Sequence, residues 1–148
     1  MSFFGKLKSP NASIAMLFDK GASSLREPLQ GKFDISASEE FDADELRIEM
    51  VVTEEVRATE QKKSGQQMVP VTAQQRITLY QGKSTVAGGR HFTNGFRETI
   101  PFSISLPSNI PPTYRSQNVH TTWMMKGVIG VKGRPDVTTH EMEVVITY

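Results

Sequence analysis

The segment from Gly82 to Arg97 contains the residues whose types and spacing come closest to a chemical site. Gly88 and Gly89 permit backbone angles that aim successive amides at one anion, and nearby cations can then hold a phosphate or carboxylate. The full phosphate-loop pattern is absent, and paired glycines also make ordinary turns, so a plain turn is the alternative. The side chains predicted to bind an anion or an acidic partner are Lys83, Arg90, His91 and Arg97.

Histidines and carboxylates form no catalytic or metal-binding pattern. His120 and His140 fall on strands expected to be neighbours, but a closed zinc site needs four ligands. Glu39-Glu40 and Glu54-Glu55 are adjacent pairs, and adjacent side chains on a strand point to opposite faces, so neither pair can act jointly as acid and base. No nucleophile-elbow motif is present. We therefore expect no enzyme, no cofactor and no metal site.

The composition excludes several classes of protein. A chain of 148 residues with 37% hydrophobic residues suits a single domain with its own core. The sequence has no cysteine, which rules out disulfides and fits the reducing cytoplasm. No apolar run approaches the roughly 18 residues of a membrane-spanning segment. The formal net charge is only +1 and no set of stacking aromatics is visible, which argues against nucleic acid.

The first part of the chain is expected to differ from the rest. Residues 1–12 are predicted to be a flexible segment in front of one domain spanning residues 13–148. Met1–Ser9 combines three large apolar residues with two lysines and could make peripheral contact with an anionic membrane, although one or two turns give little area. The alternative is a terminal segment whose phenylalanines pack on the domain.

Acidic and basic residues are segregated along the chain. Residues 34–60 contain ten acidic and two basic residues, a net charge of −8, whereas residues 61–134 contain ten basic residues and one acidic residue, a net charge of +9. These segments could attract each other between copies of the chain, or they could be solvated strand faces of different sign.

The elements that must position these residues are strands. In Thr99–Pro112, Phe102 and Ile104 alternate with small polar residues, which is the two-residue period of a strand with one buried face. Proline then ends the strand, because it cannot donate to a ladder. The same period predicts strands over Ser13–Phe18, Pro28–Ala37, Glu45–Arg57, Val69–Tyr80, Val119–Lys132 and Val137–Tyr148. About seven to eight strands and no helix predict an all-β, immunoglobulin-like antiparallel sandwich.

Several segments carry more specific expectations. Ser13–Phe18 is apolar on both sides, so we expect it to be covered on both faces or to be an edge strand that needs covering. Gly31 interrupts an apolar face and predicts a β-bulge. Thr59–Gln67 is polar and predicts a flexible hairpin connection, while Gln81–Gly95 leaves room for only a short strand. The expected core residues are Phe33, Ile35, Leu46, Ile48, Ile77, Leu79, Phe102 and Trp123.

Three sequence elements resemble those of arrestin-like sandwich domains. Ile100–Pro107 (IPFSISLP) is similar to the family's apolar-Pro-Phe-small-apolar-x-Leu-Pro strand, and Pro111–Tyr114 (PPTY) is similar to the turn that follows it. Leu29–Phe33 (LQGKF) resembles the element that opens the family's second strand. The resemblance covers about Ser13–Ile146, and the family includes arrestins, the arrestin-like subunit of retromer and bacterial sporulation-control proteins.

This resemblance implies an arrestin-type sandwich with a non-enzymatic adaptor or scaffold role in the cytoplasm. Family members usually carry two sandwiches in tandem, and this chain matches only the amino-terminal one. An open sandwich leaves edge strands to which an extended peptide or a partner subunit can pair. The alternative is a structural protein that forms a homo-oligomer through its sandwich edges and its complementary charged segments.

Overall fold

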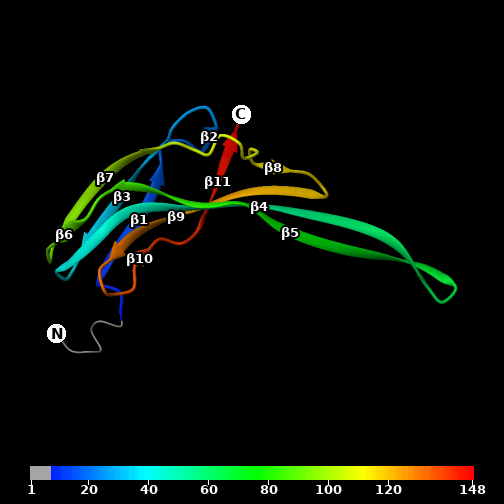
Figure 1. Ribbon diagram of the computed structural model, residues 1–148, viewed down its shortest axis with the longest axis horizontal. Helices are drawn as coiled ribbons and strands as arrows, with labels where there is room; N and C mark the ends of the chain where they lie inside the picture. The colour runs from blue at the N-terminus through cyan, green and yellow to red at the C-terminus, as the bar shows by residue number, and fades with distance from the viewer. Residues whose placement is uncertain (1–7) are drawn as a thin grey trace.

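The computed structural model describes residues 8–148 as two packed sheets with one hairpin that projects beyond them (Figure 1). The small sheet has the strand order β1–β3–β7, formed by Ala12–Phe18, Leu29–Ala37 and Arg97–Ile104. The large sheet has the order β2–β11–β9–β4–β5, formed by Ala22–Ser24, Met142–Thr147, Val119–Val131, Phe41–Ser64 and Gln67–Ala87. The short strands β6, β8 and β10 pair with β4, β9 and β9 and span Arg90–Phe92, Tyr114–Arg115 and Val137–Thr138. The predicted all-β sandwich is confirmed.

The described residues contain no helix, and hence no helix long and apolar enough to cross a membrane.

The core lies between the two sheets and follows the predicted alternation. Phe102 and Ile104 of β7 are buried, whereas Pro101 and Ser103, which alternate with them, are exposed. Trp123 is fully buried and its indole Nε1 donates a hydrogen bond to the carbonyl of Pro111 at 3.0 Å. Six of the eight expected core residues are buried: Phe33, Ile35, Leu46, Ile48, Phe102 and Trp123.

The other two expected core residues, Ile77 and Leu79, are not in the core. Ile77 is 45% exposed and Leu79 only packs against the margin of the core. Both lie on the part of β5 where the hairpin extends past the small sheet, so that sheet does not cover them. The prediction was wrong there because alternation shows which residues share a face and not whether another layer covers that face.

Gly31 does not form the predicted bulge. Strand β3 pairs with β1 and with β7 without any register shift, and Gly31 lies between Phe18 and Phe102 in that pairing. A Cβ atom at this position would lie 2.6 Å from Cζ of Phe102 and would also collide with the carbonyl oxygen of Leu17. Glycine is needed because the Phe102 ring lies over the backbone here.

Strand β1 is at an edge of the small sheet, but only one of its faces is covered. Ile14 and Met16 are buried, whereas Ala15 and Leu17 are exposed. The expectation that both faces are covered was therefore wrong, and an open strand edge remains.

Residues 8–12, predicted to be flexible, are fixed by several contacts. The hydroxyl of Ser9 donates to the carbonyl of Asp136 at 3.0 Å, and the amide of Asn11 donates to the carboxylate of Glu39. Pro10 is buried. Residues 1–7, including the apolar residues considered for membrane contact, lie outside the described residues.

Strands β4 and β5 form a hairpin much longer than the sequence predicted. The expected flexible connection is strand as far as Ser64, and β5 resumes at Gln67 after a two-residue turn. Gly65 occupies the first turn position with φ of 64°, where a two-residue hairpin of type II′ requires glycine. Strand β5 then continues to Ala87, through much of the segment where only a short strand was expected.

We call residues 54–77 the arm. Beyond Val56 it extends past every other strand (Figure 1), and each residue from Arg57 to Thr78 is exposed.

Candidate interaction surfaces

The four predicted anion-binding side chains lie on three different strands. Lys83 is on β5, Arg90 and His91 are on β6, and Arg97 begins β7. Lys83 already donates from Nζ to Oε1 of Glu45 at 2.7 Å. Its charge is therefore compensated within the chain.

Arg90 also has partners within the chain. Its guanidinium lies 3.6 Å from the carboxylate of Glu98 and 5.4 Å from the ring centroids of both Phe92 and Phe96. These two rings pack edge to face at 4.8 Å. Arg90 therefore links β6 to Phe96 by a cation–π contact and to Glu98 by an ion pair.

His91 bridges two carboxylates. Its Nδ1 lies 2.6 Å from Oδ1 of Asp42 and its Nε2 lies 2.8 Å from Oε1 of Glu40. The hydrogen bonds to Asp42 and then to Glu40 raise the pKa of His91 above its usual value. Both ring nitrogens can donate at once only in the imidazolium form, so the geometry favours a charged histidine.

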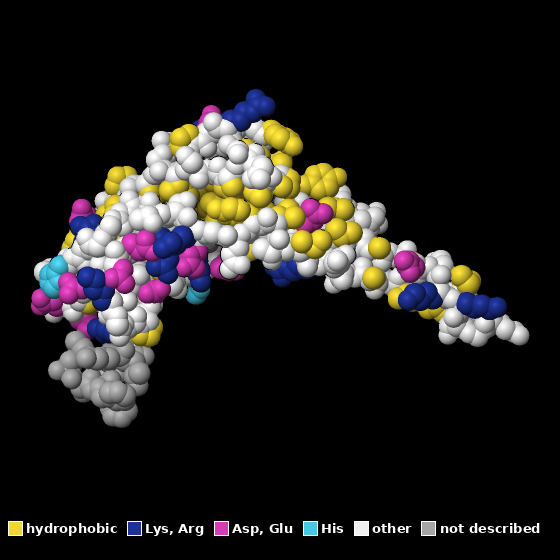
Figure 2. Space-filling view, in the orientation of Figure 1, with side chains coloured by type: hydrophobic (Ala, Val, Ile, Leu, Met, Phe, Trp, Pro, Cys, Tyr) yellow, Lys and Arg dark blue, Asp and Glu magenta, His cyan; other side chains and the backbone are white. Residues whose placement is uncertain are grey.

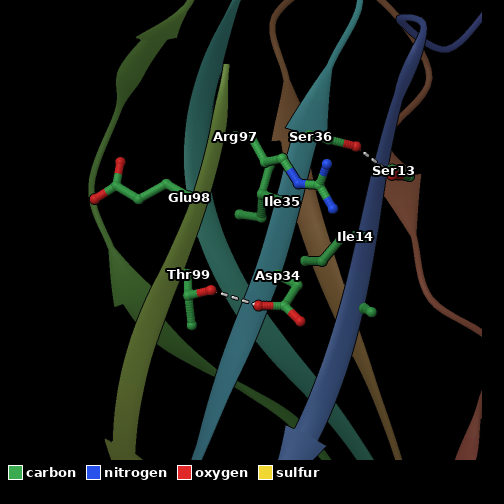
Figure 3. Close-up of a pocket in the computed structure, with 9 residues that line it drawn as sticks. Ser13, Ile14, Asp34, Ile35, Ser36, Arg97, Glu98 and Thr99 are labelled. Carbon is green, nitrogen blue, oxygen red and sulfur yellow. Dashed lines mark hydrogen bonds between the residues drawn. The ribbon is translucent and has the colours of Figure 1, made fainter. Parts of the chain in front are cut away.

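Arg97 lines an open hollow of about 620 Å³ on the outer face of the small sheet (Figure 3). Its guanidinium extends from β7 across β3 toward β1. Beside it, Thr99 donates to Asp34 at 2.6 Å, and the hydroxyls of Ser13 and Ser36 are 2.7 Å apart. Within residues 8–148, Arg97 has no carboxylate at ion-pair distance, so it remains available to an acidic group of a partner.

The acidic and basic segments are joined by ion pairs within one chain. Ion pairs join the acidic residues Glu39, Glu45 and Glu49 to basic residues beyond position 61: Glu39–Arg134, Glu45–Lys83 and Glu49–Lys126. These contacts account for part of the charge segregation without a second copy of the chain.

Arg47 is at the centre of the most extensive of these ionic networks. Its side chain is 15% exposed and contacts the carboxylates of Glu49 and Asp136 at 2.9 Å and of Glu45 at 3.4 Å. Burial lowers the pKa of Arg47, but the hydrogen bonds to Asp136 and Glu49 outweigh it and raise the pKa overall. This network holds β4 against the turn before β10.

No three histidine or acidic side chains among residues 8–148 gather as a metal site would need. His120 Nε2 lies 2.9 Å from the carbonyl oxygen of Ser116, within its own strand connection.

The arm has two chemically different faces. The register of β4 with β5 sets Glu54 opposite Ile77, Ala58 opposite Ala73 and Lys62 opposite Val69, so these side chains share one face. The apolar residues of this face, which we call the apolar face, are Val56, Ala58, Val69, Val71, Ala73 and Ile77. Hydrophobic side chains recur along the arm in Figure 2.

The opposite face of the arm is polar. There the hydroxyls of Thr59 and Thr72 are 3.3 Å apart, and the amide of Gln74 donates to Glu55 at 3.0 Å. Cross-strand pairs of this kind stabilise a two-stranded ribbon whose polar face is in water.

The apolar face of the arm continues the buried face of β4. Leu46, Ile48 and Val52 are fully buried against the small sheet, and the same alternation continues to Val56, which is half-buried, and to Ala58, which is exposed. Beyond Val56, β4 also loses its pairing with β9, while the outer edge of β5 pairs with no strand in the described part of the chain. The arm therefore presents an apolar surface and free strand edges together.

Sequence reasoning missed this surface because the arm is rich in charged and amide residues. The signal that was present is the alternation Val69-Pro70-Val71-Thr72-Ala73, which predicted only the first part of the strand Val69–Tyr80.

No protein-family model and no curated protein sequence matches the chain. Among solved structures, it is similar to Spo0M, a sporulation control protein from Bacillus subtilis, with a TM-score of 0.61 and 16% sequence identity over 93% of this chain. The chain spans 50% of the length of that protein. The likeness confirms the arrestin-like sandwich that Ile100–Pro107 indicated, and at this identity it establishes the fold alone.

Proposed function

We propose that this protein is a non-enzymatic interaction module of arrestin-like type, acting in the cytoplasm as an adaptor that binds a protein partner through the arm. The apolar face of the arm carries the proposal. Soluble proteins seldom leave contiguous apolar surface open unless a partner uses it. Here Val69, Val71 and Ile77 are each about 40% exposed or more, on an element that contributes little to the core.

The free edge of β5 favours a partner that binds as an extended segment. A strand edge with unpaired amides and carbonyls can accept a peptide by main-chain pairing, while alternate side chains set specificity. Pro70 has no amide to donate, so the stretch from Val71 toward Tyr80 is the part of this edge best suited to pairing.

The test uses a photo-crosslinking amino acid placed at Val71 or at Thr72 in the full chain, expressed in the source cells. These neighbours are at the same distance from the arm tip but point to opposite faces. We expect a defined crosslinked band from position 71 and little from position 72. Equal labelling from both positions, or none from either, would count against the apolar face as a docking surface.

A further inference from the structure

We infer that the partner of the arm is a second copy of this chain, with the two apolar faces packed against each other and the arms running in opposite directions. This inference rests on the proposed function, because it names the occupant of the same surface. The two-fold axis passes between Ala58 and Ala73 of the two copies. The side chains of the arm are evenly spaced about that point.

The centre of the arm is small and its flanks are complementary. Ala58 and Ala73 lie opposite each other, and two such pairs can approach closely at a crossing point. Glu54 and Lys62 each lie four residues from Ala58 along β4. A two-fold rotation therefore places Glu54 of one copy over Lys62 of the other, and does so twice.

The same rotation pairs apolar side chains on β5. Ile77 and Val69 each lie four residues from Ala73, so Ile77 of one copy meets Val69 of the other. Both are exposed in the single chain, at 45% and 40%. Contact between copies would remove them from water, which is the favourable term for association.

The charges on the apolar face also select the register. In the described residues neither Glu54 nor Lys62 has an ion-pair partner within its own chain, so both are available. Sliding the arms by two residues in one direction would oppose Glu54 to Glu60. Sliding them the other way would set Lys62 over Val56. Of these three registers, only the one centred on Ala58 matches acid with base. It also sets Glu60 over Val56 of the other copy, whereas the other two oppose a pair of acids or set Lys62 over an apolar side chain.

The size of the contact predicts a weak dimer. Nine residues of each strand at about 3.3 Å per residue and two strands about 4.8 Å apart give a face of roughly 30 by 10 Å. Two such faces bury on the order of 600 Å², well below the roughly 1,200 Å² of a stable interface. We therefore expect a dimer that forms in the micromolar range and dissociates on dilution.

The experiment is sedimentation velocity of the purified full chain over a concentration series. Glu54→Lys and Lys62→Glu are each expected to weaken dimerisation by about tenfold or more, since each places like charges together at two symmetric positions. An equimolar mixture of the two variants again sets acid against base at both positions and should recover the dimer. Glu55→Lys and Lys63→Glu, on the polar face, are the matched controls and should leave it unchanged.

Folding of each variant is checked by far-UV circular dichroism and by the fluorescence of Trp123, the single tryptophan, which is buried in the core and pairs with Val52, two residues before Glu54. A chain that stays monomeric at every concentration would overturn the inference, as would single variants that dimerise normally or a mixture that does not recover. A crosslink from Val71 to a different protein would overturn the second copy as partner while leaving the proposed function standing.

Discussion

Replacing Gly31 by alanine tests the close packing of the three neighbouring strands of the small sheet. The added Cβ would lie 2.6 Å from Cζ of Phe102 and would also meet the Leu17 carbonyl. The Phe102 ring cannot easily move aside, because it is 6% exposed and packs against Phe33 at 5.0 Å and Phe18 at 6.0 Å between ring centroids. The backbone of β1 would therefore have to shift as well.

The expected cost of Gly31→Ala is about 3 kcal/mol, the upper part of the range for one extra carbon in a packed core. In a domain of this size each kcal/mol lowers Tm by about 2–4 °C, so a fall of about 6–12 °C is expected. Urea unfolding followed by the fluorescence of Trp123 measures the free energy directly, since this side chain is fully buried in the folded state.

Gly21→Ala is the matched control, because a Cβ there would meet nothing within 4 Å. That variant also reports the modest gain from a less flexible unfolded chain, about 0.4–1 kcal/mol. Adding Phe102→Leu to Gly31→Ala should recover only part of the loss, since the Leu17 carbonyl remains in the way. If Gly31→Ala proves as stable as Gly21→Ala, the close approach of Phe102 is not the reason for glycine.

Three further changes have defined outcomes. Arg47→Met should lower the free energy of unfolding by about 1–3 kcal/mol in urea, because it leaves partly buried carboxylates without their cation; an unchanged midpoint would show that the ionic network is dispensable. Because the pKa of His91 is raised in the folded state, its stabilisation is complete below its usual value of 6.5 and is lost as pH rises through the folded pKa. Wild type should therefore exceed His91→Gln in stability at about pH 5.5 and approach it at about pH 8.5, and a difference that grows with pH would contradict this. Arg97→Gln should weaken binding of an acidic peptide in a fluorescence titration, whereas Arg115→Gln, whose arginine pairs with Glu143, should not; equal effects would remove the hollow on the small sheet as an acidic-group site.

The sandwich could be predicted from the sequence because burial on one face imposes a period of two. Thr99–Pro112 shows this most clearly, and the resulting strand, its exposed Pro101 and its buried Phe102 are as expected. Trp123 was also assigned correctly, since it falls in phase with neighbours that all reach the core.

The arm could not be predicted in the same way. Ile77 alternates with polar neighbours as any core strand residue does, and only the extent of the opposite sheet decides whether it is covered. The extent of the opposite sheet depends on the lengths of β3 and β7. The residues around Ile77 carry no information about those lengths. The polar residues of Thr59–Gln67 predicted a loop, but the segment is strand as far as Ser64 because β4 and β5 pair along it.

The predicted anion site illustrates a similar limit. Lys83 and His91 were identified by type and local spacing, but their carboxylate partners are 38 to 51 positions earlier in the chain. Strand pairing brings these groups together, so whether a cation is free or compensated is known only once the register is known.

The pairing of β2 with β11 determines when synthesis of this molecule can yield a finished fold. These strands run parallel, and the hydroxyl of Thr147 donates to the carbonyl of Ser23, 124 positions away. Ile146 of β11 is fully buried in the core. The sandwich can therefore close only after nearly all of the described chain has left the ribosome. The β4–β5 hairpin is local and can form as soon as Ala87 emerges. One edge of β9, in contrast, has no partner strand until β11 has been synthesised. Until β11 has been made, the unpaired edge of β9 is therefore open to pairing with other chains.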